Sequence, residues 1–206
     1  MSSGSDQSYP SETVVILGLG LIGGSLARAL RRSGFSRHFI GCGHREPSLR
    51  RGVELGVIDE FTLDLAEATE RADILVVCAP TLIAAEALRE ILPRLAGADG
   101  GPVVTDAASV KGNLLRAAKE SWGGEFPPRL VLGHPIAGSE RSGVDASSAD
   151  LFVNHRVILT PEEGNDPAAV ELIRRMWVST GAEVVDMSVS AHDAVLAATS
   201  HLPHVL

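Results

Sequence analysis

Three glycines near the N-terminus follow a spacing that suits the binding of phosphate groups. The pattern GxGxxG comes directly after a short β-branched apolar run and opens a segment with helical periodicity, which is the context that a dinucleotide-binding turn requires. The first glycine permits a tight turn, the second lets the backbone approach a pyrophosphate, and the third allows the helix to pack closely on the strand. A tight turn without a ligand is the alternative, but the strand and helix around the motif favour the dinucleotide. The residues that we assign to this site are Gly18, Gly20, Leu21, Ile22 and Gly23.

The segment expected to contact the far end of a dinucleotide carries basic residues instead of a carboxylate. About 20 residues after the glycine motif, an Asp or Glu would bind the ribose 2′-hydroxyl of NAD, whereas this sequence has Gly43, His44 and Arg45. An arginine there could pair with the 2′-phosphate of NADP, and a hydrogen bond to a charged group contributes about 1.5–3 kcal/mol, or roughly 10- to 150-fold in affinity. We therefore expect NADP or NAD as the cofactor, with NADP favoured through His44 and Arg45. The alternative is that Arg45 stacks on the adenine and NAD is accepted as well.

Two later segments carry small or polar residues after apolar runs, where the carboxyl ends of parallel strands would form a crevice. Cys78, Ala79 and Pro80 end one such run and are expected to contact the cofactor, although a simple turn into a helix explains them equally well. Ser109 follows the next run. It is either an ordinary helix N-cap type, as is Asp106, or a side chain beside the nicotinamide and the reacting carbon.

Histidines provide the candidates for acid–base chemistry. His134 follows the apolar run 130–132 and is expected at the same crevice, where an imidazole with a pKa of about 6.5 can accept a hydroxyl proton at neutral pH. His192, His201 and His204 gather near the C-terminus. Because structural metal sites need about four ligands and no further ligand of suitable spacing is evident, we expect no metal.

The elements that must position these residues alternate between strands and helices. This alternation predicts an α/β fold, with a Rossmann-like, doubly wound and mostly parallel sheet that has helices on both faces. We expect a flexible tail over 1–12, a dinucleotide-binding domain over 13–187, and over 188–206 the start of a C-terminal all-helical domain that is truncated here; the family resemblance described below implies that this is a dimerisation domain. The expected strands are 13–17, 38–42, 74–78, 103–105, 130–132, 156–160 and 183–186, and the expected helices are 22–32, 47–55, 63–71, 83–93, 110–121, 167–180 and a last one from 190.

Composition narrows the classes of partner. The 206 residues contain 18 Lys and Arg against 26 Asp and Glu, a net charge of −8, so the basic surface that a nucleic-acid binder needs is missing. No apolar run approaches the roughly 18 residues of a membrane span. Only two cysteines are present and no secretory signal is visible, which favours a reducing cytoplasm.

Four motifs occur in an order that resembles a known enzyme family. They are GLGLIGGSLARAL from Gly18, TDAASVK from Thr105, GHPIAGSERSGVDAS from Gly133 and HDAVLAATSHLPH from His192. Together they resemble the prephenate/arogenate (cyclohexadienyl) dehydrogenases of tyrosine biosynthesis, over about Thr13 to Leu206. The first motif is shared by many dehydrogenases, whereas the third and fourth are much more specific.

The resemblance implies an oxidative decarboxylation with hydride transfer to NAD(P)⁺, which turns prephenate into 4-hydroxyphenylpyruvate or arogenate into tyrosine. By similarity, His134 accepts the proton of the ring hydroxyl, and Ser109 hydrogen-bonds that hydroxyl and helps to orient His134. The resemblance also implies a homodimer through a helical domain that is mostly absent from this chain and that lends a substrate-binding arginine. The residues implied on the substrate side are Ser139, Glu140, His201 and His204.

Two other readings of the sequence remain open at this point. One is another NAD(P)-dependent dehydrogenase of the hydroxyacid type, which would rely on a lysine in its helical domain. The other is a non-catalytic NAD(P)-binding module. The specific GHPIAGSE segment argues against the first, and the presence of both His134 and Ser109 argues against the second. The sequence leaves open the choice between prephenate and arogenate and any inhibition by tyrosine.

Overall fold

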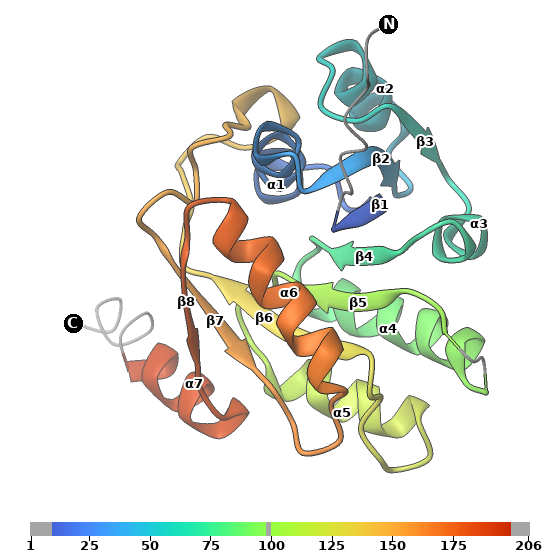
Figure 1. The fold of residues 1–206 in the computed structure, drawn as a ribbon, viewed down its shortest axis with the longest axis vertical. Coiled ribbons are helices and arrows are strands. Elements are labelled where there is room, and N and C mark those ends of the chain that lie inside the picture. The colour runs from blue at the N-terminus through green and yellow to red at the C-terminus, as the bar shows by residue number, and fades with distance from the viewer. Residues whose placement is uncertain (1–9, 98–99, 199–206) are drawn as a thin grey trace, which may run out of the picture.

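A single sheet of eight strands forms the centre of the computed structural model, which describes residues 10–97 and 100–198 (Figure 1). The strand order is β3-β2-β1-β4-β5-β6-β7-β8; the first six strands are parallel, β7 runs antiparallel to β6, and β8 is parallel to β7. The expected α/β, doubly wound and mostly parallel fold is therefore confirmed. The strands are β1 (Ser11–Leu17), β2 (Ser36–Cys42), β3 (Glu60–Thr62), β4 (Ile74–Val77), β5 (Val103–Asp106), β6 (Leu130–Pro135), β7 (Arg156–Thr160) and β8 (Glu183–Asp186).

Helices cover both faces of this sheet. One face packs against α1, α2 and α6, and the other against α3, α4 and α5; Figure 1 shows α6 in front of the sheet and α4 behind it. No helix in the described part of the chain is long and apolar enough to cross a membrane. The helices are α1 (Leu21–Ser33), α2 (Glu46–Glu54), α3 (Leu65–Glu70), α4 (Thr81–Leu95), α5 (Gly112–Ser121), the 3₁₀ turn η1 (Val144–Ala146), α6 (Pro167–Ser179) and α7 (Val189–Leu196).

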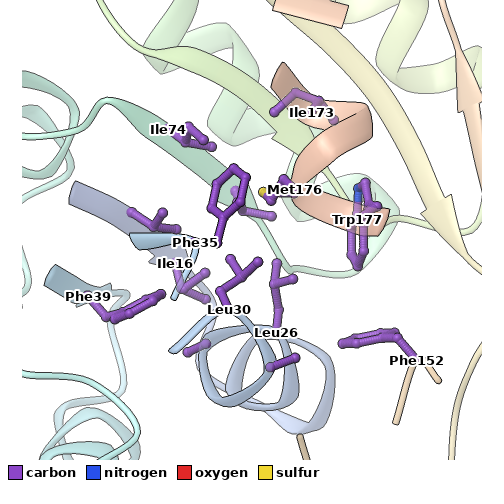
Figure 2. Packing of buried hydrophobic residues seen from close by; sticks show 14 of the residues in the cluster. Ile16, Leu26, Leu30, Phe35, Phe39, Ile74, Phe152, Ile173, Met176 and Trp177 are labelled. Atoms are coloured by element: carbon purple, nitrogen blue, oxygen red, sulfur yellow. The ribbon is translucent and has the colours of Figure 1, made fainter. Parts of the chain in front are cut away.

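Alternating residues of the central strands supply the two layers of the core. In β1, Val14 and Ile16 belong to the cluster under α1 and α6, whereas Val15 belongs to the cluster under α4 and α5, and all three are fully buried. Successive side chains of a strand point to opposite faces, so a strand covered on both sides is apolar throughout. Figure 2 shows the first cluster, where Ile16 lies near Leu26 and Leu30 of α1.

The N-terminal edge of the fold differs from the sequence prediction. Strand β1 begins at Ser11, which is paired with Ser36, and the Glu12 and Thr13 amides donate to Asp73. The prediction that the tail extends to residue 12 was therefore wrong at its last two positions. The sequence prediction also missed β3, because a three-residue edge strand is too short to show a period of two.

Proline did not end α4 where the sequence predicted. Pro93 lies inside the last turn, and the helix continues to Leu95. A proline removes one backbone N–H and one intrahelical bond, a loss that the last turn tolerates here because Leu92 and Ile91 are buried against the sheet.

Candidate active site

The glycine turn between β1 and α1 has the shape of a phosphate cradle. Gly18 has a φ of +97°, and a Cβ there would lie 2.5 Å from the Cys78 carbonyl oxygen. A Cβ on Gly23 would lie 2.4 Å from the Gly18 carbonyl oxygen, so these two glycines are required by close packing. At Gly20, the N-cap of α1, a Cβ would meet nothing within 4 Å. The space over Gly20, at the positive end of the α1 dipole, fits a pyrophosphate.

A cleft of about 340 Å³ opens beside this turn, at the carboxyl ends of β4, β5 and β6. It brings together residues that the sequence analysis chose from four separate segments, namely the glycine turn, the segment after β4, Ser109 and His134. The lining residues are Ile22, Cys78, Ala79, Pro80, Thr81, Ala107, Ala108, Ser109, His134, Pro135 and Ala137.

Other predicted residues lie outside this cleft. His44 and Arg45 are exposed between β2 and α2, with Arg45 at the N-cap of α2, on the opposite side of β1 from the cleft. Ser139 and Glu140 are exposed in the segment after β6 and do not line the cleft. His201 and His204 lie outside the described residues.

His134 lies within β6, where it faces Ile158 of β7 in the ladder, because the strand extends to Pro135 and not only to the predicted residue 132. Its Nδ1 lies 3.0 Å from Nε2 of His192, and the two rings meet edge to face with centroids 5.2 Å apart. His192 is fully buried on α7, and its Nδ1 lies 2.7 Å from the Asp193 carboxylate. The ring of His134 is thus held by His192, while Ser109 lines the same cleft.

Asp193 also caps helix α5. Its two carboxylate oxygens accept hydrogen bonds from the backbone N–H groups of Lys111, at 2.9 Å, and Gly112, at 2.8 Å. The cap of α5 is therefore supplied by α7. The reading of Asp106 and Ser109 as local N-caps was wrong, and the helix begins at Gly112 and not at Val110.

A buried ion pair lies under the cleft. Lys111 and Asp106 are both fully buried and hydrogen-bonded to each other. Lys111 Nζ also donates to the Gly133 carbonyl oxygen at 2.6 Å, and Asp106 accepts from the Ala108 and Gly133 amides. Breaking such a pair by removing one partner is strongly destabilising, so it fixes β5, β6 and the start of α5 relative to one another.

Comparison with known proteins identifies the family of this chain. Residues 26–186 match the model of the nucleotide-binding domain of prephenate dehydrogenase. The chain belongs to the prephenate dehydrogenase family. The matched part begins just after the glycine turn and includes all of the residues that line the cleft except Ile22.

Curated relatives of the prephenate dehydrogenase family align with nearly the whole chain. The chain is 32% identical to a prephenate dehydrogenase of Bacillus subtilis over 95% of its length, and 33% identical to a cyclohexadienyl dehydrogenase of Zymomonas mobilis over 94%. It spans 52% and 64% of those two relatives' own lengths.

Solved structures give the same family. A prephenate dehydrogenase from A. aeolicus, in complex with hydroxyphenyl propionate and NAD⁺, is 37% identical with a TM-score of 0.83, covering 98% of this chain and 68% of that one. An arogenate dehydrogenase from Synechocystis is 32% identical with a TM-score of 0.79, covering 93% and 65%. A 3-hydroxyisobutyrate dehydrogenase of Mycobacterium tuberculosis, at 13% identity, shares the fold alone.

The surroundings of His134 in this prephenate dehydrogenase family member keep its imidazole neutral. Burial, Lys111 and His192 together lower the pKa of His134 to about 4, against the Asp193 carboxylate, which raises it. Burial also raises the pKa of the Cys78 thiol to about 12. At neutral pH the cleft therefore presents an uncharged base and a protonated thiol.

Three side chains that shape this family's site were not assigned there from the sequence. Lys111 and Asp193 occur in the motifs that carried the resemblance, and His192 was considered only as one of a group of histidines near the C-terminus. Their membership in those motifs was the one available signal. Among the described residues, no three His, Cys, Asp or Glu side chains are grouped so as to hold a metal ion.

Proposed function

We propose that the protein catalyses the oxidative decarboxylation of prephenate to 4-hydroxyphenylpyruvate, of arogenate to tyrosine, or of both. The observation that carries this proposal is the neutral imidazole of His134, in the same cleft as Ser109 and next to the glycine turn. Membership of the prephenate dehydrogenase family supplies the reaction. The bound nicotinamide would supply the acceptor for the hydride that leaves the ring carbinol carbon.

The chain's own residues would bind the ligands and handle the proton. Backbone N–H groups at the start of α1 would hold the pyrophosphate over Gly20, and Cys78, Ala79 and Pro80 would contact the cofactor along the cleft. His134 would accept the hydroxyl proton as the carbonyl develops, while Ser109 would hydrogen-bond and orient that hydroxyl. General acid–base catalysis of this kind contributes typically about 10²–10⁴-fold.

NADP is the proposed preferred cofactor, with NAD as a second candidate. Support comes from the basic end of β2, where the side chains of His44 and Arg45 are exposed and make no ion pair with any described residue. An arginine side chain that forms no ion pair within residues 10–97 and 100–198 is available to a 2′-phosphate at this place.

The substrate side and the assembly are proposed from family similarity. Ser139, Glu140, His201 and His204 would complete the substrate site in a cytoplasmic homodimer formed through a helical domain. The NAD⁺ complex of the A. aeolicus relative contains hydroxyphenyl propionate, an aromatic carboxylate that resembles the product class.

An assay of the full-length protein tests the function directly. We would follow the absorbance of reduced cofactor with prephenate or arogenate against NAD⁺ or NADP⁺. Turnover in any of the four combinations supports the proposal and identifies both ligands. No turnover in any combination, with cofactor binding intact, overturns it in favour of a hydroxyacid substrate or a binding-only module.

A further inference from the structure

A continuous chain of hydrogen-bonding groups runs from the cleft into α7. It passes from His134 through His192 to the Asp193 carboxylate, with contacts of 3.0 and 2.7 Å. Neither His192 nor Asp193 lines the cleft, so both can act on a substrate only through His134.

The Asp193 carboxylate determines which ring nitrogens of His192 and His134 carry protons. Its interactions with the Lys111 and Gly112 amides and with His192 lower the pKa of Asp193, although burial opposes this, so the carboxylate is ionised. An ionised carboxylate only accepts hydrogen bonds, and His192 Nδ1 must therefore carry a proton.

The tautomer of His134 follows from that of His192. In a neutral His192 that carries its proton on Nδ1, the other ring nitrogen, Nε2, carries a lone pair. The contact with His134 then requires that His134 Nδ1 be the donor. In the neutral form of His134, this leaves the lone pair on Nε2, the nitrogen that is not engaged by His192.

We propose that His192 and Asp193 are positioning residues that hold His134 in the Nδ1–H tautomer, and that His192 takes up the Nδ1 proton when His134 accepts the proton of the substrate hydroxyl. This inference rests on the proposed function. It assigns to α7 a part in the reaction that neither the sequence nor the family relationship had assigned.

The transfer balances without any further reactant. The substrate O–H bond breaks, its proton binds to His134 Nε2, and its electron pair becomes part of the carbonyl bond as the hydride leaves for the nicotinamide. The His134 Nδ1–H bond breaks and its proton binds to His192 Nε2. His134 ends neutral, and the positive charge resides on His192 in contact with the Asp193 carboxylate. When the ring carboxylate leaves as CO₂, the electron pair of the broken C–C bond makes the ring aromatic, and the phenolate oxygen takes the proton back along the same path.

The charged groups around His134 explain why moving the proton on to His192 would stabilise the positive charge that arises in the reaction. Lys111 lies before α5, Asp106 lies on β5, and His192 and Asp193 lie on α7. Burial, Lys111 and His192 all disfavour a charged His134, and Asp193 alone among the groups acting on its pKa favours it. A proton that moves on to His192 places its charge directly beside that carboxylate.

Kinetics of Asp193→Asn and His192→Gln test the proposal in the full-length protein, with Asp166→Asn as the matched control. Asp166 caps α6 through the Ala168 amide, remote from the cleft, so this variant also replaces a capping carboxylate. In Asp193→Asn, either orientation of the side-chain amide sets its NH2 group against the backbone N–H of Lys111 or of Gly112, so the single proton arrangement of the wild type is lost together with the negative charge. An Asp-to-Asn change behind a catalytic histidine costs about 10⁴-fold in serine proteases. We expect kcat to fall at least about 10²-fold in both α7 variants, with cofactor Kd unchanged, and to stay at the wild-type value in the control. Wild-type kcat in either α7 variant overturns the proposal.

Nitrogen NMR of the His134 ring, recorded without substrate, separates this inference from the proposed function. We expect a protonated Nδ1 in the wild type and in Asp166→Asn, and a larger fraction of rings protonated on Nε2 in Asp193→Asn. A protonated Nε2 in the wild type overturns the inference even if the protein turns over prephenate. If the wild type turns over neither substrate, the proposed function fails and the ring tautomer alone decides whether α7 positions His134.

Discussion

Replacing Gly20 and Gly23 one at a time by alanine separates cofactor binding from folding. The two glycines belong to one motif but differ in what a new methyl group would meet. A Cβ on Gly23 would lie 2.4 Å from the Gly18 carbonyl oxygen and 2.7 Å from Ile16 Cγ2, whereas a Cβ on Gly20 would meet no atom within 4 Å. Each variant is therefore the control for the other.

The expected magnitudes follow from these distances. At Gly23 the nearest atom is a backbone oxygen that cannot rotate away, so α1 must shift from β1, and overpacking of this kind costs about 1–3 kcal/mol. For a chain of this size that lowers Tm by about 2–12 °C. At Gly20 the lost N-cap preference and the gain from a less flexible unfolded chain nearly offset each other, so stability should change by less than about 1 kcal/mol.

Cofactor affinity should show the opposite order of effects. A methyl group on Gly20 would fill the space proposed for the pyrophosphate, and we expect Kd to rise at least about tenfold, equivalent to about 1.4 kcal/mol. Thermal unfolding followed by circular dichroism, with and without cofactor, measures both quantities, because saturating ligand at about 100 times Kd adds roughly 2.7 kcal/mol to the wild type. Wild-type affinity in Gly20→Ala would refute the placement of the pyrophosphate. A wild-type Tm in Gly23→Ala would refute the close approach of α1 to β1.

Three further predictions concern the base, the cofactor and pH. His134→Asn should lower kcat at least about 10²-fold and leave cofactor Kd nearly unchanged; unchanged turnover in steady-state assays would remove His134 from the reaction. Arg45→Ala should weaken NADP binding about 10-fold or more while NAD binding changes little, as measured by titration calorimetry, and equal losses would show that Arg45 does not contact the 2′-phosphate. Because burial, Lys111 and His192 together lower the pKa of His134 from 6.5 to about 4, the unfolded state binds this proton first, so stability is fully present above pH 6.5 and decreases as pH falls toward 4. The pKa shift of His134 corresponds to at most about 3 kcal/mol of unfolding free energy, and to less because the side chain is partly exposed. The measurement is the unfolding free energy of the wild type and of His134→Asn, each at pH 7.5 and at pH 4.5. An equal loss of stability between the two pH values in both proteins would contradict the prediction.

Local patterns in the sequence were sufficient for most of the fold. Strands β7 and β8 were predicted with the observed bounds, and Gly34 ends α1 in the left-handed conformation that glycine favours. These elements are specified by runs of neighbouring residues and by one backbone preference. The errors at β3 and α5 have another origin, because an edge strand depends on its neighbour and the cap of α5 comes from Asp193, more than 80 residues away.

The residues of the site also fall into two groups, those that local patterns predicted and those that they could not predict. His134, Ser109 and the glycine turn could be assigned because each follows an apolar run, and parallel strands bring such positions to one edge of the sheet. The partners of His134 could not be assigned, since its contact with His192 joins residues 58 positions apart and no local pattern encodes that distance. The buried Lys111–Asp106 pair was hidden for a different reason, because a lysine beside a helix start looks like a solvated side chain.

The capping of α5 by a residue of α7 divides the site into a part that depends on α7 and a part that does not. The glycine turn and the cleft walls are built from elements that precede α7, so they can be complete before α7 has docked. Helix α7 supplies the carboxylate that caps α5 and places His192 against His134. If α7 were displaced, the proposed nucleotide site would keep all its residues, while α5 would lose its cap and His134 its contact with His192.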